Sequence, residues 1–423
     1  MKINIAQNKG DPVKNEVGFM IIGGLSVLMV LLGFLADTPK GILNGLKAIL
    51  MEPGTLVTDY IGVGGLGATL VNAGVLTLIF CIMLYKLKIK FNGASYASLF
   101  LIAGFAFFGK NLVNVWFIVI GVYLYARYQK VQFSRYIYIA LFGTAMAPMV
   151  SELFFSSDGQ WLTRIALGAG TGILIGFILP SLSAYLMRVH QGFNLYNIGF
   201  ASGIIGTVFV SVYKSYGFTT TPKMIWTTGN NGLIAPWLYG LSIVLILIGI
   251  KFDKNVFGGF RNVIKHHGRL VTDFTLLEGH APSLFNMGVN GILATSYILF
   301  INGDLNGPTI GGIFTVIGFG AFGKHAKNIL PIWIGVSIGA FTKLWGINDP
   351  GVQLAALFGT GLAPIAGEYG WKFGILAGFI HSSVVLNVGV LHGGINLYNN
   401  GFAAGLVAAF LIPAIDAIRK DEA

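Results

Sequence analysis

The sequence ALFGTAMAPMVSE at residues 140–152 returns as ALFGTGLAPIAGE at residues 356–368. Eight of the thirteen positions are identical, and they include Gly-Thr, Ala-Pro and the closing Glu. A stretch this specific does not recur by chance half a chain later. The repetition therefore indicates that the chain is built from two copies of one unit.

Five further blocks repeat, in the same order in both halves. The pairs are GLS at 24–26 and 240–242, LVTDY at 56–60 and LVTDF at 270–274, NAGV at 72–75 and NMGV at 286–289, FGK at 108–110 and 322–324, and HQGFNLYNIGFASG at 190–203 and HGGINLYNNGFAAG at 392–405. The blocks predict a cytoplasmic tail at 1–16, a first membrane repeat at 17–216, a linker at 217–230, a second repeat at 231–418 and a tail at 419–423.

The composition is typical of an integral membrane protein. Of the 423 residues, 55% are hydrophobic and only 10% are charged, whereas a soluble domain is usually about 25% charged. Apolar stretches such as 17–35, 62–85 and 162–187 are long enough to cross a hydrocarbon core of about 30 Å. We therefore expect a multi-pass protein of the cell membrane, which in a bacterium is the inner membrane.

The net charge of +11 and the single cysteine argue against two other classes. No basic cluster lies on a soluble module, so a nucleic-acid partner is not expected. Loop lysines and arginines are instead expected on the cytoplasmic side, next to anionic lipid. Cys81 alone cannot form an internal disulfide or a multi-cysteine metal site, and no metal or cofactor is predicted.

Matched loops of the two copies carry different charges. KLKIK at 86–90 corresponds to INGD at 301–304, and ARYQKVQFSR at 126–135 corresponds to FTKLWGINDPG at 341–351. The bias reverses in the first long loop, where the second copy is the more basic. Because basic loops stay in the cytoplasm, matched loops should lie on opposite sides of the membrane. The repeats are therefore predicted to be inverted, with both termini in the cytoplasm.

Each copy contains seven apolar segments. In the first copy they lie near 17–36, 62–85, 95–109, 111–126, 136–155, 162–187 and 194–213. The predicted fold class is an all-α integral membrane protein of two inverted-topology repeats, with broken or re-entrant helices at the midplane. Inverted repeats are typical of transporters and channels, in which the solute path lies at the repeat interface.

The repeated stretch predicts a helix break in each copy. Pro148 has no N–H for the carbonyl of Thr144, and Pro364 has none for that of Thr360. We expect a free carbonyl and a hydroxyl at one point near the midplane, beside a water-filled path. The alternative is a packing kink, because Pro and Gly are common in membrane helices and Thr can bond to the preceding turn.

A carboxylate follows each break. Glu152 and Glu368 lie eight residues after the threonines, which is about 12 Å along a helix, so they should lie towards opposite faces of the membrane. One interpretation is a pair of acidic vestibules or proton-binding groups that face a cavity. The other is a pair of partly solvated carboxylates near helix ends.

Three further pairs of residues are candidates for the solute path. They are Asn72 and Asn286, Phe142 and Phe358, and Asn194 and Asn396. The first pair lies inside apolar runs, which favours a place in the pore, and the phenylalanines either narrow the path or pack in the core. The last pair, in the NLYN motifs, either caps a helix at a break or donates to a solute. Asp59 and Asp273 follow Leu-Val-Thr, and Thr58 or Asp59 is expected to cap the helix that follows, with a transport role as the alternative.

Part of each copy resembles urea transporters, which have two inverted halves. In that family each half carries an Asn-x-x-x-Gly-Leu segment, a Gly-rich helix and a Leu-Pro-x-x-Thr-x-Pro-Phe half-helix. This chain has a similar order, with NAGVL at 72–76, ASYASLFLIAGFAFFG at 94–109 and then Leu141 through Pro148. The resemblance implies a urea-transporter-like core in which the threonine of the family corresponds to Thr144 and Thr360. The whole chain is similar to an uncharacterised family of bacterial multi-pass membrane proteins, a domain of unknown function.

The sequence favours a channel or facilitator for a small polar solute that passes between the repeats. The alternative is a proton- or cation-coupled secondary transporter that uses Glu152 and Glu368, and a lipid-handling protein is a third hypothesis. An enzyme is not expected, because nearly every polar group occurs in both copies and no catalytic motif is present. The expected partners are a small polar solute or cation and the lipid bilayer, and a homo-oligomer is compatible with the sequence.

Overall fold

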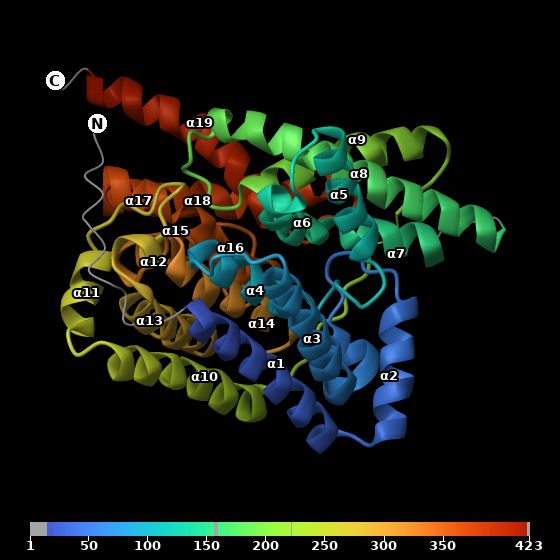
Figure 1. Cartoon of the computed structure of the whole chain (residues 1–423). Coiled ribbons are helices and arrows are strands. Elements are labelled where there is room, and N and C mark those ends of the chain that lie inside the picture. The colour runs from blue at the N-terminus through green and yellow to red at the C-terminus, as the bar shows by residue number, and fades with distance from the viewer. Residues whose placement is uncertain (1–14, 156–159, 221, 421–423) are drawn as a thin grey trace.

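The computed structural model describes residues 15–155, 160–220 and 222–420, and these are mostly helical (Figure 1). The first half contains α1 (Asn15–Ala36), α2 (Pro39–Met51), α3 (Tyr60–Lys86), α4 (Gly93–Phe105), α5 (Trp116–Tyr128), α6 (Ile137–Gly143), α7 (Ala147–Phe155), α8 (Trp161–Val189) and α9 (Asn197–Ser215). The second half contains α10 (Asn231–Phe252), α11 (Val256–Val263), α12 (Phe274–Leu277), α13 (His280–Phe300), α14 (Gly307–Gly318), α15 (Ala326–Thr342), α16 (Pro350–Gly359), α17 (Ala363–Tyr369), α18 (Trp371–Val388) and α19 (Asn399–Lys420).

Nine helical segments within the described ranges are long and apolar enough to cross a membrane. They are 16–36, 60–86, 133–155, 161–189, 197–215, 231–252, 280–300, 371–392 and 399–419. The helices α4, α5 and α14 are also apolar but shorter. The protein is therefore an all-α multi-pass membrane protein, as its composition predicts.

The seven segments predicted in the first half correspond to α1, α3, α4, α5, the interrupted helix α6–α7, α8 and α9. The first long loop differs from the prediction, because it contains α2, and the matched loop contains α11. The Thr38 hydroxyl caps α2 by accepting the Gly41 N–H at 3.1 Å, and Ile42 and Ile49 are buried on the helix. Its 13 residues are too few to cross a bilayer, so hydropathy alone does not reveal it.

Contacts between the two halves are reciprocal, which reveals a pseudo-two-fold axis between them. The Asp59 carboxylate accepts the Gly307 N–H at 3.1 Å, and the matched Asp273 carboxylate accepts the Gly93 N–H at 2.9 Å. Such exchange of equivalent contacts is characteristic of a two-fold relation. Because Gly93 and Gly307 begin α4 and α14, each half holds the first turn of the central helix of the other half.

The central helices α4 and α14 run antiparallel. A Cβ at Gly104, near the end of α4, would lie 2.9 Å from the Gly311 Cα near the start of α14. A Cβ at Gly318, the last residue of α14, would lie 3.2 Å from the Ala97 Cα near the start of α4. Two equivalent helices that pack antiparallel are related by an axis perpendicular to both. Inverted repeats have this relation when the helices lie along the membrane normal.

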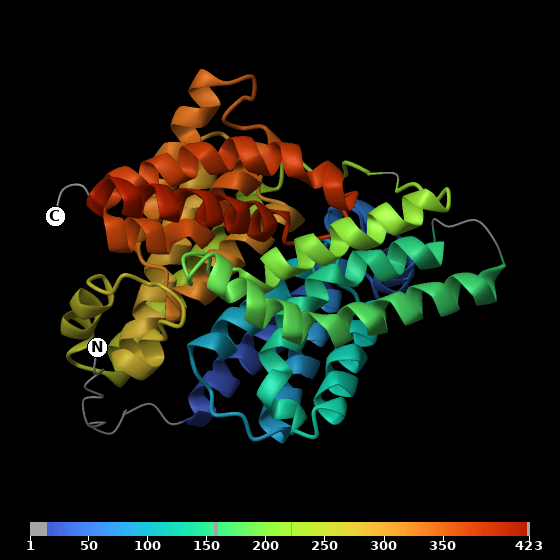
Figure 2. The same ribbon diagram turned by 90° about the horizontal axis from the view of Figure 1, so that it is seen from above.

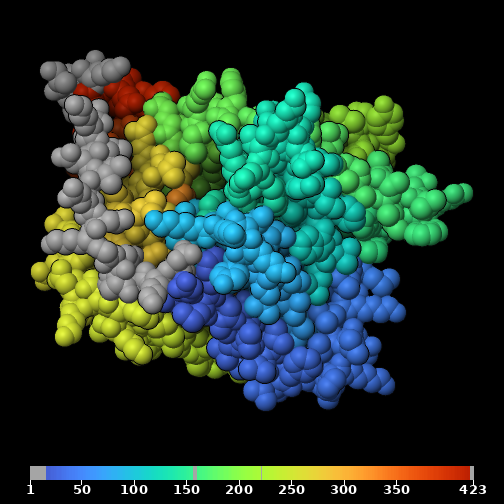
Figure 3. Space-filling model, in the orientation of Figure 1, coloured from blue at the N-terminus to red at the C-terminus, as the bar shows by residue number. Residues whose placement is uncertain are grey.

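The matched helices α2 and α11 lie on opposite sides of the molecule. In Figure 1, α2 lies at the lower right and its counterpart α11 at the left. The space-filling view shows the blue residues of α1 and α2 at the lower right and the yellow-green residues of α10 and α11 at the lower left (Figure 3). Figure 2 shows the first half, in blue to green, beside the second half, in yellow to red. This arrangement agrees with inversion, and the orientation in a bilayer stays a prediction.

We expect Gly104→Val to destabilise the protein, because a side chain at this position has no room between α4 and α14. Overpacking of a core usually costs about 1–3 kcal/mol, so the thermal midpoint of the purified protein in detergent should fall. Gly24→Val on α1 is the matched control, since a Cβ at Gly24 meets no atom within 4 Å. Equal midpoints for the two variants would contradict the close packing of the central helices.

Candidate functional site

The helix break at each Thr/Pro motif is present, but its carbonyl is not free. A 3₁₀ turn over Thr144–Met146 separates α6 from α7. The Thr144 carbonyl accepts the Ala147 N–H, and the Thr144 hydroxyl donates to the Leu141 carbonyl at 2.6 Å. Thr360 repeats both contacts in the second half. The prediction of a free carbonyl and hydroxyl is therefore wrong, because the tighter turn supplies the donor that the proline lacks.

The carbonyl that loses its local partner belongs to the next residue. In a 3₁₀ turn the Ala145 carbonyl would accept from Pro148, which has no N–H. It accepts instead the Leu397 N–H, in the NLYN motif of the other half, at 3.1 Å. In the reciprocal contact, the Gly361 carbonyl accepts the Leu195 N–H at 2.9 Å. The two repeated motifs therefore complete the backbone hydrogen bonding of each other across the repeat interface.

The asparagines of the NLYN motifs shape the loops that make these bonds. The Asn194 Oδ1 accepts the Tyr196 N–H at 2.9 Å, and its Nδ2 donates to the Gly401 carbonyl of the other half at 3.0 Å. Asn396 accepts the Tyr398 N–H at 2.9 Å in the matched turn. These Asx turns directly precede α9 and α19. The structure thus favours helix initiation over a solute contact for this pair.

Asn72 and Asn286 hold the turns that follow the central helices. The Asn72 Nδ2 donates to the Lys110 carbonyl at 2.9 Å, and the Asn286 Nδ2 donates to the Lys324 carbonyl at 2.7 Å. Both side chains are fully buried. They supply donors where the end of a helix leaves carbonyls without a partner. The structure therefore gives this pair a structural role, in which each asparagine holds the backbone of Lys110 or Lys324.

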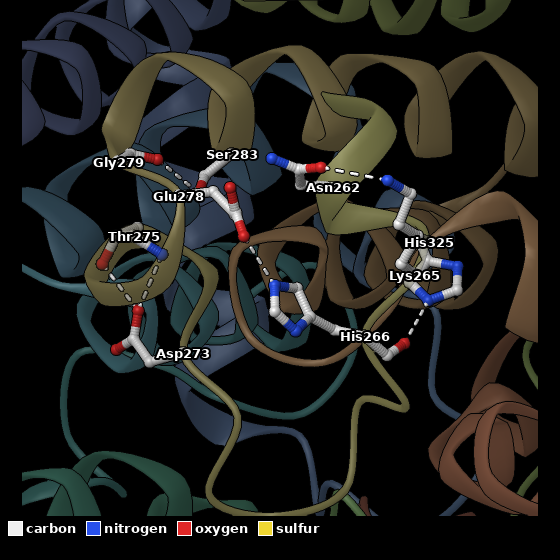
Figure 4. Close-up of polar contacts among 9 residues, drawn as sticks. All are labelled: Asn262, Lys265, His266, Asp273, Thr275, Glu278, Gly279, Ser283 and His325. Atoms are coloured by element: carbon white, nitrogen blue, oxygen red, sulfur yellow. Dashed lines mark hydrogen bonds and ion pairs between the residues drawn. The ribbon is translucent and has the colours of Figure 1, made fainter. Parts of the chain in front are cut away.

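Asp59 and Asp273 cap helices, as predicted. The Asp273 Oδ1 accepts the Thr275 N–H at 2.9 Å and the Thr275 hydroxyl at 2.6 Å (Figure 4). The Asp59 Oδ1 accepts the Ile61 N–H at 3.0 Å, and each carboxylate also receives a donor from the other half, as described above. Burial raises the pKa of both carboxyl groups, and the donors oppose that rise. Negative charge at a helix N-terminus is further stabilised by the helix dipole.

The two glutamates of the repeated motif have different surroundings. Glu152 on α7 is fully buried. The Glu368 side chain on α17 is 32% exposed and pairs with the His267 ring. The two glutamates are therefore not an equivalent pair, because only Glu152 is fully buried. Glu368 agrees with the interpretation of a partly solvated carboxylate near a helix end.

Four aromatic rings form a series between the two halves, which the sequence analysis did not identify. Adjacent ring centroids are 4.9 Å apart for Phe105 and Tyr398, 5.0 Å for Tyr398 and Tyr196, and 5.1 Å for Tyr196 and Phe319. The outer rings occupy matched positions, since Phe105 is the last residue of α4 and Phe319 directly follows α14. The inner rings are the matched tyrosines of the NLYN motifs. The pseudo-two-fold axis therefore passes between the two tyrosines of this aromatic series.

A buried lysine lies at each end of the aromatic series. The Lys110 Nζ lies 4.9 Å from the Phe105 ring centroid, and the Lys324 Nζ lies 5.0 Å from the Phe319 ring centroid. Both lysines are fully buried, and neither takes part in an ion pair between described residues. Cation–π contact offsets part of the cost of removing an ammonium group from water. A charged residue at such a place in a membrane protein is by default a candidate functional group.

Two cavities approach the aromatic series. The larger has a volume of about 570 Å³ and the smaller about 140 Å³. Their walls share matched residues, which are Phe108, Phe358 and Leu397 in the larger cavity and Phe322, Phe142 and Leu195 in the smaller. The cavities are therefore related by the pseudo-two-fold axis. The structure places Phe142 and Phe358 both in cavity walls and in a cluster of core aromatic side chains, so it does not decide between narrowing of a path and packing in the core.

The sequence carried signals for the aromatic series and its lysines. Lys110 and Lys324 close the repeated FGK blocks, and the two tyrosines lie in the repeated NLYN motifs. A lysine beside an apolar segment is normally interpreted as a loop residue that stays in water. For this reason the sequence alone does not single out Lys110 and Lys324 as buried residues. Among the described residues, no group of three or more His, Cys, Asp or Glu could hold a metal ion.

We expect Asp59→Ala to lower the thermal midpoint markedly, because this carboxylate joins three segments. It accepts the N–H groups of Ile61, Thr227 and Gly307. A buried donor left without an acceptor costs about 1–3 kcal/mol. Asp253→Ala is the control, since Asp253 accepts only an exposed N–H at 2.8 Å. If both variants lost the same stability, the structural role of Asp59 would be refuted.

The chain belongs to a family of proteins of unknown function, DUF1576, whose model matches residues 38–215 and 252–417. The two matched stretches fall within the two predicted repeats. Neither a curated protein nor a solved structure matches the chain significantly. The expectation of an uncharacterised family is therefore confirmed. The resemblance to urea transporters is not shown and stays a prediction.

Proposed function

We propose that this DUF1576 protein is a membrane channel or facilitator that carries a small polar solute along the interface between its two repeats. The observation that best supports the proposal is the pair of matched cavities that approach one aromatic series. In inverted-repeat transporters the solute site lies at the repeat interface and is framed by interrupted helices. Here α6–α7 and α16–α17 are interrupted, and the short helices α4 and α14 end beside the aromatic series.

The walls of the larger cavity suit a small polar solute. Its apolar residues are joined by Thr219, Thr220, Asn399 and Asn400, which bring hydroxyl and amide groups to the cavity. A few polar groups in a mostly apolar concave wall are typical of sites for small molecules. Lys214 also lines this cavity, at the end of α9.

The aromatic series closes the path between the cavities. Tyr196 and Tyr398 are almost fully buried, so a solute can pass only when the rings move. The two matched cavities differ about fourfold in volume. We interpret the difference in cavity volume as a sign that the structure represents one of two conformations. In this conformation the half beside the larger cavity is the more open. Exchange of the conformations between the repeats would open the two sides in turn.

Proton- or cation-coupled transport has weaker support from the structure. In the form that the sequence suggests, it uses Glu152 and Glu368 as a matched pair. Glu368 is held by His267 near the surface, whereas Glu152 is buried within the first half. A passive path lined by the cavities is therefore the better-supported form of the proposal, and a pH gradient distinguishes the two.

Liposomes that contain the protein should swell faster in urea, formamide or glycerol than protein-free liposomes, as measured by light scattering. Gly389→Phe should return the rate to near that of protein-free liposomes, because its ring would occupy the larger cavity. Gly232→Phe on α10 is the matched control, since a Cβ at Gly232 meets no atom within 4 Å. Equal rates for both variants would refute the path, and uptake that requires a pH gradient would favour coupled transport.

Lipid handling is a second candidate function, favoured by one observation. An apolar groove of about 630 Å³ lies between α1 and α10. Its lining includes the matched glycines Gly24 and Gly240, together with the exposed side chains of Met20 and Val244. A groove that opens sideways suits an acyl chain, whereas a closed passage suits a solute.

We expect no acceleration of phospholipid exchange between leaflets, because the aromatic series and not the groove forms the proposed path. The measurement is dithionite quenching of a fluorescent phospholipid in the same liposomes. The double variant Gly24→Leu/Gly240→Leu fills the groove without a clash at either Cβ. Rapid exchange by the unmodified protein that this variant abolishes would assign the function to the groove.

A further inference from the structure

The two ends of the aromatic series have the same residues but different hydrogen bonds. At one end the Lys324 Nζ donates to the Tyr196 hydroxyl. The matched residues at the other end are Lys110 and Tyr398. Neither the Lys110 Nζ nor the Tyr398 hydroxyl has a hydrogen-bond partner among the described residues, although both atoms are buried.

The backbone near Lys110 does not supply the missing acceptors. The Asn72 Nδ2 occupies the carbonyls of Ala106 and Lys110. The Phe105 carbonyl accepts the N–H groups of Phe108 and Lys110. A buried donor without an acceptor is costly, and a buried ammonium without a counter-ion is more so. An acceptor that carries negative charge would satisfy the Lys110 Nζ and stabilise its protonated form.

This end of the aromatic series adjoins the larger cavity. The Phe105 ring, beneath the Lys110 Nζ, lies 5.1 Å from the Phe108 ring and 5.6 Å from the Phe358 ring. Phe108 and Phe358 both line the larger cavity. The Phe105 ring and then the Phe108 and Phe358 rings thus lie between the Lys110 Nζ and the cavity, and rotation of these side chains would connect them.

We propose that Lys110 and Tyr398 bind a small monovalent anion, such as a short carboxylate, that reaches them from the larger cavity. This inference rests on the proposed transport function and names its substrate class. The anion would accept charge-assisted hydrogen bonds from the ammonium and the phenol hydroxyl. The surrounding phenylalanines offer no further donors, so the site suits a single negative charge on a small ion.

The Lys324 end presents the other state of the same site. There the Tyr196 hydroxyl serves as the acceptor of the ammonium, and the adjoining cavity is the smaller of the two. The lysine would release the anion when its ammonium group bonds to the tyrosine hydroxyl, and it would bind the anion when that bond breaks. Matched sites in opposite states at the two ends are what alternating access requires.

The test is thermal unfolding of the purified full-length protein in detergent at constant ionic strength. Gluconate, a larger anion, is replaced stepwise by formate, acetate, nitrate or chloride. A ligand that binds the native state raises the midpoint with the logarithm of its concentration. We expect such a rise for at least one of the small anions.

Lys110→Met should abolish the rise and leave the midpoint in gluconate unchanged or higher, since it removes an unpaired buried charge. Lys343→Met is the matched control, because the Lys343 Nζ already donates to the Phe379 carbonyl and the Ser382 hydroxyl, each at 2.7 Å. Tyr398→Phe keeps the ring and should raise the anion concentration at half-maximal shift roughly tenfold. This second variant tests the site even if Lys110→Met fails to fold.

No rise with any small anion overturns the assignment, and so does an equal rise in Lys110→Met or Tyr398→Phe and the unmodified protein. The outcome is separable from that of the transport experiment. Solute uptake by liposomes without an anion effect overturns this inference alone. An anion effect that depends on Lys110, without uptake of any solute, overturns the proposed function and leaves the site standing.

Discussion

The rest of the structure depends on one constraint, which is that a backbone group inside a membrane protein cannot be left without a hydrogen bond. Each such group costs several kcal/mol in hydrocarbon. A proline in a buried helix therefore leaves a carbonyl that needs a donor from another segment. Here each repeat supplies the donor that the other needs, because the Leu397 N–H donates to the Ala145 carbonyl and the Leu195 N–H donates to the Gly361 carbonyl. Neither Thr/Pro motif is complete within its own repeat.

The same reciprocity fixes the two short central helices. At 13 and 12 residues, α4 and α14 are too short to cross a bilayer alone. Their first turns receive Asp273 and Asp59 from the opposite repeat, and the turns after them are held by Asn72 and Asn286. Because both ends are secured inside the protein, each helix can end in the interior. This ending is what buries a lysine at each end of the aromatic series.

The sequence predicted the features that depend on local pattern and failed where a partner lies far along the chain. Apolar runs and proline positions are local, so the seven segments of the first half and the positions of the helix breaks could be predicted, whereas the inverted relation of the two repeats stays a prediction. The fate of the freed carbonyl could not, since the donor to Ala145 is Leu397, in the other half. Likewise, the burial of Lys110 depends on where α4 ends in space, whereas hydropathy treats any lysine beside an apolar run as a loop residue.

Matched sites with identical residues would be expected to form identical contacts, yet one lysine bonds to its tyrosine and the other does not. The contact between the two tyrosines gives a physical reason. Their ring centroids are 5.0 Å apart, so a shift of one ring towards its lysine has to be accommodated by the other ring. This contact would couple the two ends, so that closing one end would favour opening the other. In the proposed transport function, a preference for asymmetric states at this contact would distinguish alternating access from an open pore.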